Sequence, residues 1–393
     1  MLGRGKREGG RVKAAWWSAW RSVRSTINNT WHNHRPTLPS SPFPLPSHIL
    51  PTKRWLAPLL ALALAGCGQP PLYQQTGFVF GTKVDIAIWG LPEPVAARHA
   101  AAVLAELDRL HARLHPWQPS PLTQLNAALA RGEAGNADAE LVGLIEQARG
   151  YARRSDQLFN PAIGGLIGLW GFHADQYAAR LPDPARVAAQ VAAHPTLDDL
   201  QIVGSSIGST NPAVQLDFGG FAKGWALDRS ANYLRRHRVY NALINIGGNV
   251  LALGRKGEEP WKVGLQHPRQ PRAMAVIALR DGEAIGTSGD YQRYFEVGGR
   301  RYSHLLDPRT GQPARTMQSA TVIAPPSLEA GAVSDAATKP IFIGGREHAL
   351  DYAGRFGVGD VLLVANDGSV FVSASMQPRL QWLVPPPHLY RLR

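Results

Sequence analysis

The sequence predicts an α+β fold, a single domain of antiparallel sheets flanked by helices. Amphipathic helical patterns dominate the region from about residue 94 to 194, whereas short apolar runs separated by glycine turns dominate from about residue 200 onward. Helices and strands are thus segregated in blocks instead of alternating regularly, which favours α+β over α/β. No GxGxxG motif follows the first strand pattern, so a Rossmann dinucleotide site is not expected.

The elements follow from local patterns. FVFGTKVDIAIWG (78–90) alternates apolar residues and predicts a strand. In 94–115, Val103, Leu107, Leu110 and Leu114 recur at helical spacing, and a proline stands in the first turn. A proline-punctuated loop and a short helix are expected next, and similar helical patterns predict helices over 139–156, 184–194 and 222–238. Runs such as LQIVG, AVQLDF, ALINIGGNVLALG and AMAVIALR predict strands of an antiparallel sheet.

The basic charge of the chain is concentrated at its start. The 393 residues carry a formal charge of +13, but residues 1–66 hold ten Lys/Arg against one acid, Glu8, which leaves 32 basic and 28 acidic residues after position 66. This net charge of +4 comes without a basic stripe interleaved with aromatic residues, so we expect no nucleic-acid binding. A hydrophobic content of 44% is enough for a sizeable core.

The N-terminal region resembles a bacterial lipoprotein signal. Lys53 and Arg54 precede the apolar run WLAPLLALALAG, which is too short to span a bilayer, and the sole cysteine, Cys67, follows. We therefore expect a signal peptide over 53–66, lipidation at Cys67, a tether over 67–77, and a cell-envelope protein anchored on the periplasmic side of a membrane. A buried cysteine behind a plain signal peptide is the alternative. Residues 1–52 are expected to be a disordered extension or the product of a mis-assigned start codon.

The stretch LDFGGFAKGWALD (216–228) has the chemistry of an anion site. We predict a strand over 214–218, a sharp turn at the two glycines, and a helix from Phe221. A helix N-terminus with Lys223 in its first turn suits phosphate, and Asp217 is placed to hold a hydroxyl, a ring N–H or a cation. The stretch lacks the GxxxxGK[ST] pattern of a Walker A loop. A tight turn with Lys223 in solvent is an equally available interpretation.

Further segments follow in a fixed order: NIGGN (245–249), GTSGDYQRYFE (286–296), SHLLDPRTG (303–311) and AVSDAATKPIFIGG (332–345). Together with FGTKVDI (80–86), HPWQPSPLTQLN (115–126) and LFNPAIGGLIGLWGFH (158–173), they resemble the FAD:protein FMN transferase (ApbE) family. The resemblance covers 78–375, leaving 376–393 as a C-terminal tail. It implies an ApbE/T-fold-like single domain.

The resemblance also implies a reaction. In the family, a threonine hydroxyl of a partner flavoprotein attacks the FMN phosphorus of FAD, and AMP leaves. The partners include subunits of membrane redox complexes such as sodium-translocating NADH:quinone reductase. The resemblance assigns His304 a catalytic role, as proton acceptor or phosphate contact, and a structural histidine is the alternative. It assigns FAD contacts to Phe80, Trp117, Leu158, Phe159, Asn160, Asp217, Lys223 and Leu306.

The implied metal site departs from the family pattern. The family binds Mg²⁺ through backbone carbonyls at the positions of Gly220 and Ala332, a carboxylate that matches Asp335, and a threonine four residues later. Here that residue is Lys339, and Thr338 stands one position earlier. Thr338 shares a helix face with Asp335, so it is expected to substitute in part. Pro340 is expected to push Lys339 out of helical geometry, and the Lys339 ammonium is expected either to lie where the cation belongs or to point outward.

The same residues are compatible with two other functions. One is an FAD-binding lipoprotein without transferase activity, which the loss of the threonine ligand favours. The other is an FAD pyrophosphatase that releases FMN and AMP with water as the acceptor.

Overall fold

The computed structural model describes residues 71–393. The expected lipidation site at Cys67, the signal peptide and residues 1–52 lie outside this range. In the described part of the chain, no helix has both the length and the apolar character needed to cross a membrane.

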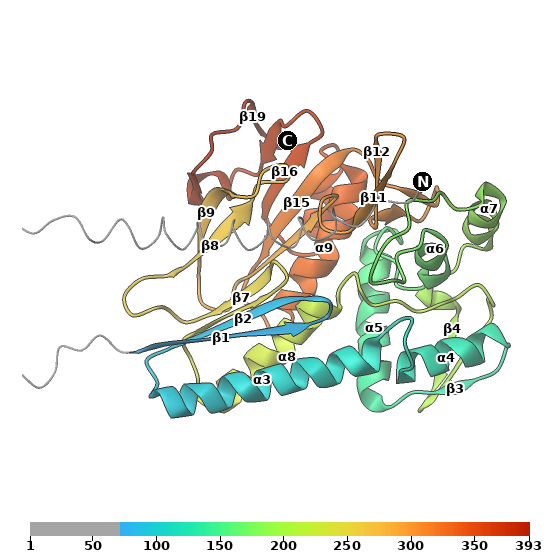
Figure 1. Ribbon diagram of the computed structural model, residues 1–393, viewed down its shortest axis with the longest axis horizontal. Coiled ribbons are helices and arrows are strands. Elements are labelled where there is room, and N and C mark those ends of the chain that lie inside the picture. Colours follow the sequence, from blue (N-terminus) through green and yellow to red (C-terminus); the bar gives the residue numbers. More distant parts are fainter. Residues whose placement is uncertain (1–70) are drawn as a thin grey trace, which may run out of the picture. The chain divides into compact units, whose positions relative to one another are not determined.

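Nine strands of the described chain form the main sheet, and every neighbouring pair is antiparallel except the last (Figure 1). In sheet order they are β1 (Leu72–Val79), β2 (Thr82–Trp89), β6 (Ala242–Ile246), β7 (Asn249–Leu253), β10 (Ala284–Gly289), β15 (Met317–Ala324), β16 (Asp360–Ala365), β17 (Val370–Val372) and β19 (Leu389–Arg391).

Smaller sheets and helices complete the described chain. The smaller sheets are β18 (Leu380–Trp382) with β9 (Ala273–Leu279) and β8 (Trp261–Gln266); β3 (Gly135–Asn136) with β5 (Ser206–Ser209) and β4 (Leu200–Val203); β11 (Tyr294–Val297) with β12 (Arg300–Ser303); and β13 (Leu306–Asp307) with β14 (Gln312–Pro313). The helices are α3 (Glu93–Leu114), α4 (Pro121–Ala130), α5 (Ala139–Arg154), α6 (Gly164–Leu169), α7 (Pro184–Ala193), α8 (Ala222–Arg236), α9 (Ala330–Gly344) and α10 (Ala349–Arg355).

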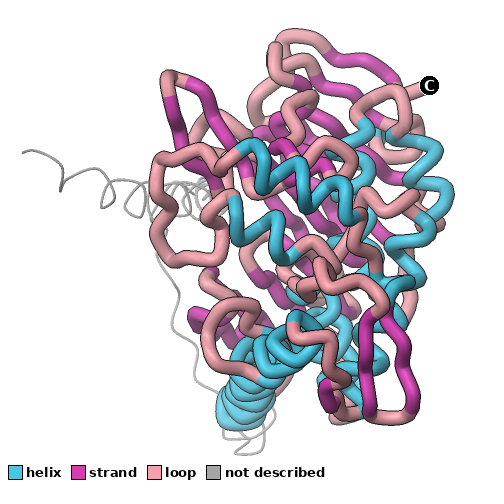
Figure 2. Tube along the Cα trace, turned by 90° about the vertical axis from the view of Figure 1, so that its right-hand side faces the viewer, coloured by secondary structure: helices cyan, strands magenta, loops and turns pink. Residues whose placement is uncertain are grey.

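The two faces of the main sheet are covered differently. Alternate residues of β16 divide between them: Val361 and Leu363 pack into the core shared with α3, α8 and α9, while Leu362 and Val364 pack against the β18–β9–β8 sheet. Period-two alternation with both faces apolar is typical of a strand buried on both sides. Figure 2, viewed from the side of α6 and α7, shows helices in front of the strands. The α+β expectation is therefore confirmed.

The predicted helices are found within a few residues of their expected ends, but several strand and boundary predictions were wrong. The segment 78–90 is a hairpin: β1 and β2 meet at a two-residue turn in which Phe80 and Gly81 both have positive φ, 55° and 66°. Right-handed strand twist favours such turns. Residues 72–77 therefore belong to β1 and are not a tether, because they pair with residues 84–89 of β2. The expected tail 376–393 likewise supplies β18 and β19 to two sheets.

The expected strand at 214–218 is replaced by an irregular segment. Only Gln215 forms a strand-like bridge, to Ile163. Leu216 instead pairs with a side chain: its N–H donates to Oδ1 of Asn126 at 2.7 Å, and Nδ2 of Asn126 donates to its carbonyl at 2.9 Å. The Asn126 amide thus satisfies the backbone groups that a neighbouring strand would otherwise satisfy.

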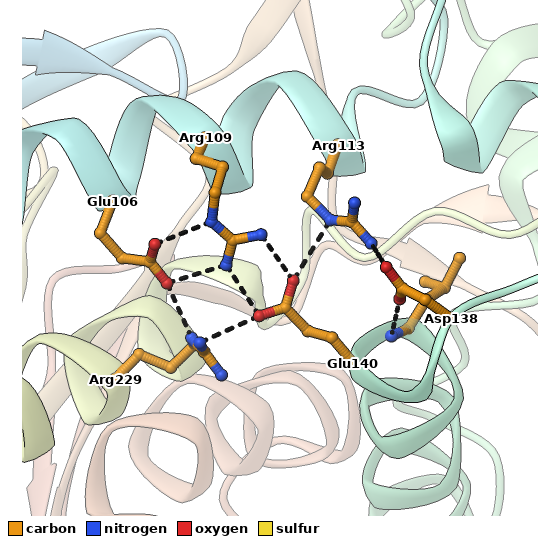
Figure 3. Close-up of polar contacts among 7 residues, drawn as sticks. Glu106, Arg109, Arg113, Asp138, Glu140 and Arg229 are labelled. Carbon is orange, nitrogen blue, oxygen red and sulfur yellow. Dashed lines mark hydrogen bonds and ion pairs between the residues drawn. The ribbon is translucent and has the colours of Figure 1, made fainter.

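A charged network joins three helices (Figure 3). Glu140 at the start of α5 pairs with Arg109 of α3 at 2.8 Å and with Arg229 of α8 at 2.9 Å. Glu106 of α3 pairs with both arginines, and Arg113 joins Glu140 at 3.2 Å. These ion pairs connect α3, α5 and α8 at the protein surface.

Candidate functional site

The site begins at a close crossing of α8 and α9. A Cβ built on Gly224 would lie 2.2 Å from the carbonyl oxygen of Gly331, and one built on Gly331 would lie 2.3 Å from the carbonyl oxygen of Gly224. Only glycine allows backbones to approach this closely. Gly224, the glycine of the AKG sequence (222–224), therefore brings the first turns of two helices together, a role that the sequence did not reveal.

This crossing delivers Asp335 of α9 to the start of α8. Its Oδ2 accepts hydrogen bonds from the N–H of Gly224 at 3.0 Å and from Nδ2 of Asn249 at 2.8 Å. Asn249 follows the Gly247–Gly248 hairpin turn, and its role as a partner of Asp335 was not foreseen from NIGGN. Burial alone raises the pKa of Asp335, but the charges of Lys339 and Lys223 outweigh burial and hold the pKa below its ordinary value. Asp335 is therefore a buried, charged carboxylate.

Two lysines surround this carboxylate. Nζ of Lys339 contacts Oδ1 of Asp335 and donates to its backbone carbonyl at 2.8 Å. Nζ of Lys223 lies 4.0 Å from Oδ2 of Asp335 and donates to the carbonyl of Gly219 at 3.3 Å. Lys223 is thus held at the diglycine turn (residues 219–220), and the interpretation that it simply points into solvent is wrong.

The group expected to bind magnesium does not fit a divalent ion in this arrangement. Helix α9 continues through Pro340, so Lys339 keeps its helical place, contrary to expectation. Thr338 is fully buried and faces β10: its Oγ1 donates to the carbonyl of Asp335 at 2.6 Å and lies 2.7 Å from Oγ of Ser288. Thr338 therefore does not substitute for the family ligand, because its hydroxyl is already engaged on the β10 side of the helix.

The charges around Asp335 lead to the same conclusion. The N–H of Ala332 donates to Oδ2 of Asp228 at 2.8 Å, in the first turn of α9, and Gly220 lies against the Lys339 side chain. At about 4 Å and an effective dielectric of about 20, one carboxylate attracts a divalent ion by ~8 kcal/mol and each ammonium repels it by as much. Two ammonium groups against one carboxylate therefore disfavour the ion. Among residues 71–393, no three His, Cys, Asp or Glu side chains gather as a metal cluster.

A second group of polar and aromatic side chains lies beside the diglycine turn. Oδ1 of Asp217 accepts the N–H of Gly219 at 2.7 Å, and its Oδ2 lies 2.9 Å from Nε2 of His173. The His173 ring stacks on Trp117, with centroids 5.4 Å apart and an interplanar angle of 21°. Burial raises the pKa of Asp217, but the contact with His173 outweighs burial and lowers it. His173 was missed from the sequence, although it ends the quoted segment 158–173.

Aromatic rings continue from this group to the first hairpin. Trp117 meets His115 edge to face at 4.5 Å, His115 meets His111 at 5.1 Å, and His111 meets Phe80 at 5.4 Å. Phe80 and Trp117, far apart in sequence and both expected to contact flavin, are therefore linked by one row of rings on α3 and the loop after it.

The other side chains that were expected to contact FAD are packed in the core or hydrogen-bonded to neighbouring backbone groups. Leu158 and Phe159 are buried in the core, and the Phe159 ring packs against Phe221 beneath the diglycine turn. The Asn160 amide is occupied: Nδ2 donates to the carbonyl of Pro195 and Oδ1 accepts the N–H of Ala162, each at 2.9 Å. Leu306 is buried with aromatic residues such as Phe172.

His304 lies on the turn between β12 and β13. Its Nδ1 faces the carbonyl oxygen of Arg293 at 3.1 Å, so Nδ1 carries the proton and Nε2 keeps its lone pair. Burial, followed by the charge of Arg293 and with contributions from Lys223 and Lys339, holds the pKa of His304 well below 6.5. The imidazole is therefore neutral at physiological pH and lies within the electrostatic reach of both lysines.

Comparisons of the sequence with known proteins agree on one family. The sequence model of the ApbE family matches residues 80–362. A Rhodobacter capsulatus protein named FAD:protein FMN transferase is 41% identical over 332 residues, covering 83% of this chain and 62% of that protein. A Treponema pallidum protein of the same name is 31% identical over 345 residues, covering 79% and 89% of the two chains. This chain thus spans less than two thirds of the Rhodobacter relative.

Solved structures share the fold. The ApbE protein of Thermotoga maritima superimposes with a TM-score of 0.70 at 30% identity, covering 79% of this chain and 99% of its own. The apo form of the Pseudomonas stutzeri flavinyl transferase ApbE gives a TM-score of 0.68 at 28% identity, with coverage of 80% and 98%. The antiparallel sheets flanked by helices are therefore the arrangement of these proteins.

Proposed function

We propose that this chain, which belongs to the ApbE family, transfers FMN from FAD to a threonine hydroxyl of a partner flavoprotein and releases AMP. The observation that carries the proposal is the contact between the start of α8 and Asp335 of α9, 3.0 Å from the Gly224 N–H to Oδ2. It brings Lys223, Lys339 and the diglycine turn together, which gives a positively charged place for a diphosphate next to the Asp217–His173–Trp117 group.

Phosphoryl transfer requires the protein chiefly to position the reacting groups and to neutralise the charge of the phosphates. The threonine oxygen would form a bond to the FMN phosphorus while the bond from that phosphorus to the bridging oxygen breaks, and AMP would leave with the electron pair. We assign the threonine proton to Nε2 of His304, whose Nδ1–H is held by the Arg293 carbonyl. A diphosphate between Lys223 and Lys339 would offset two of the charges that depress the His304 pKa, and so would raise it towards the range of a general base.

The setting of the reaction is also part of the proposal. The Lys53–Arg54 pair, the apolar run and Cys67 support a lipid anchor on the periplasmic side of a membrane. An anchored enzyme would meet acceptors that are subunits of membrane redox complexes. The presence of Cys67 immediately after Leu64-Ala65-Gly66 supports this placement.

The test is an assay of the purified full-length protein with FAD and an acceptor protein that carries a reactive threonine. Transfer predicts flavin fluorescence that stays with the acceptor band in a denaturing gel, together with one AMP per flavin transferred. An acceptor with valine in place of that threonine is the control and should stay dark. Free FMN and AMP without labelled acceptor would identify a pyrophosphatase, and FAD binding with neither product would identify a storage or delivery protein.

A further inference from the structure

The side chain of Lys339 is built into the floor of the proposed diphosphate site. Its Nζ bonds to the carboxylate and the carbonyl of Asp335, and its Cε lies 3.6 Å from the position that a Cβ on Gly220 would occupy. The side chain keeps 12% of its surface exposed, against 3% for Asp335. Lys339 therefore covers the carboxylate and separates it from the space next to the diglycine turn.

The hydrogen bonds of Asp335 leave little room for another cation. Oδ2 already accepts two donors, from Gly224 and Asn249, and Oδ1 accepts the ammonium. The nearest hydroxyl on the same helix, that of Thr338, is engaged with Ser288 and with the Asp335 carbonyl. The side-chain oxygens of Asp335 and Thr338 are thus already engaged within the fold, although a hard divalent ion requires oxygen ligands of this kind.

The net positive charge around Asp335 suits the binding of an anion. One carboxylate faces two ammonium groups, because Lys223 lies 4.0 Å from Oδ2 in addition to the direct contact of Lys339. The excess positive charge lies beside Gly220, where α8, a helix of 15 residues, begins. A lysine acts on a phosphate as a compact point charge and needs no coordination geometry.

Building on the function proposed above, we infer that the Lys339 ammonium is the resident cation of this site: it neutralises Asp335 and supplies positive charge to the diphosphate of FAD, so that FAD binds without a divalent ion. The ammonium thereby occupies the position at which the family pattern has a threonine ligand. The site is then ready for FAD regardless of the concentration of Mg²⁺.

The first experiment measures FAD affinity by quenching of flavin fluorescence in the full-length protein, in EDTA and in millimolar MgCl₂. The wild type should bind equally well in both, within about twofold. Lys339→Thr should bind about tenfold more weakly in EDTA and recover in MgCl₂. Lys262→Thr, which removes an exposed lysine paired with Glu259, is the matched control and should behave as the wild type. A wild-type affinity that rises tenfold with MgCl₂ would overturn the inference.

A second experiment separates contact with the diphosphate from simple neutralisation of Asp335. In the Asp335→Asn/Lys339→Met double variant, both charges of the pair are absent, so no buried carboxylate is left unpaired. The double variant should still bind FAD, and ADP as well, about tenfold more weakly than the wild type, because the ammonium itself is missing. Wild-type affinity for ADP in the double variant would contradict a role at the diphosphate, and circular dichroism checks that the variant is folded.

The outcomes distinguish this inference from the proposed function. Binding of FAD in EDTA without transfer to any threonine acceptor supports the resident cation and contradicts the transferase. Transfer that occurs only with MgCl₂, together with FAD binding that depends on MgCl₂, supports the transferase and contradicts the resident cation.

Discussion

Oδ2 of Asp217 lies 2.9 Å from Nε2 of His173, and the ring of His173 stacks on Trp117. The carboxylate thereby orients an imidazole whose face is parallel to an indole, next to the turn that carries Gly219. Under the proposed function, a planar part of FAD would rest against this group, and its binding would depend on both the stack and the hydrogen bond.

Loss of this contact should weaken FAD binding. We expect His173→Phe, which keeps a ring for stacking but not the hydrogen bond, and Asp217→Asn each to raise the Kd for FAD about tenfold, as expected for one buried hydrogen bond to a charged group. The double variant should be no weaker than either single one, because the two residues act through one contact. Fluorescence titration checks this, and additive losses would contradict a shared role.

Substitution of His304 should separate binding from turnover. His304→Asn keeps an N–H donor near the position of Nδ1, facing the Arg293 carbonyl, but has no counterpart of Nε2. We expect kcat for transfer to fall by about 10²-fold or more, the usual contribution of a general base. The FAD Kd should change by less than about twofold. Wild-type turnover in this variant would assign His304 a structural role only.

Because α8 and α9 cross so closely, adding one methyl group at Gly224 should lower the stability of the protein. Gly224→Ala would place Cβ 2.2 Å from the Gly331 carbonyl oxygen and 2.7 Å from Cβ of Asp335. The two helices must then separate, so we expect a loss of about 1–3 kcal/mol in the free energy of unfolding. Gly143→Ala in the exposed middle of α5, where Cβ meets nothing within 4 Å, should instead stabilise the protein by about 0.5–1 kcal/mol. Urea denaturation of both variants checks the contrast.

Because Asp228 is buried, we expect the stability of the folded protein to fall as the pH rises. Its oxygens accept the N–H groups of Gly331 and Ala332, but burial dominates and raises its pKa from 3.8 to about 8. Between these values the folded protein retains a proton that the unfolded chain has released, so the contribution to stability is greatest below pH 3.8 and declines towards pH 8. We expect the Tm of the wild type, relative to that of Asp228→Asn, to fall from about pH 5 to about pH 8. A constant difference would show that Asp228 is ionised throughout.

The surface network of Figure 3 predicts the opposite pH dependence. Hydrogen bonding to Arg109 is the main cause that lowers the pKa of Glu140, so its contribution to stability is present above 4.5 and is lost as the pH falls through its lower folded pKa. Glu140→Gln should cost about 1 kcal/mol at neutral pH and less in acid or high salt. Glu133→Gln, which breaks the more exposed pair with Arg131, should have no measurable effect. Equal effects of the two substitutions would contradict a cooperative network.

Local patterns were sufficient for several helices, but not for α6, α9 and α10, and for some of the segments that form the site. Periodicity located α3, α5, α7 and α8 because each buries one stripe of its surface. The two glycines, Lys223 and Asp335 could be selected because their chemistry is carried by short, ordered motifs. Periodicity did not reveal that 214–218 is irregular, with Asn126, 90 residues away, supplying the hydrogen bonds of the Leu216 backbone.

The sequence by itself determined the fold class, helices such as α3, α5, α7 and α8, and part of the site, including Lys223 and Asp335, because these follow from local spacing and residue type. Only the tertiary structure decided which partner each side chain takes. The choice of Lys339 over Thr338 as the group facing Gly220 follows from the rotation of α9 against α8, which is set by the Gly224–Gly331 crossing. Such a choice depends on contacts between segments about a hundred residues apart, and neither segment encodes it alone.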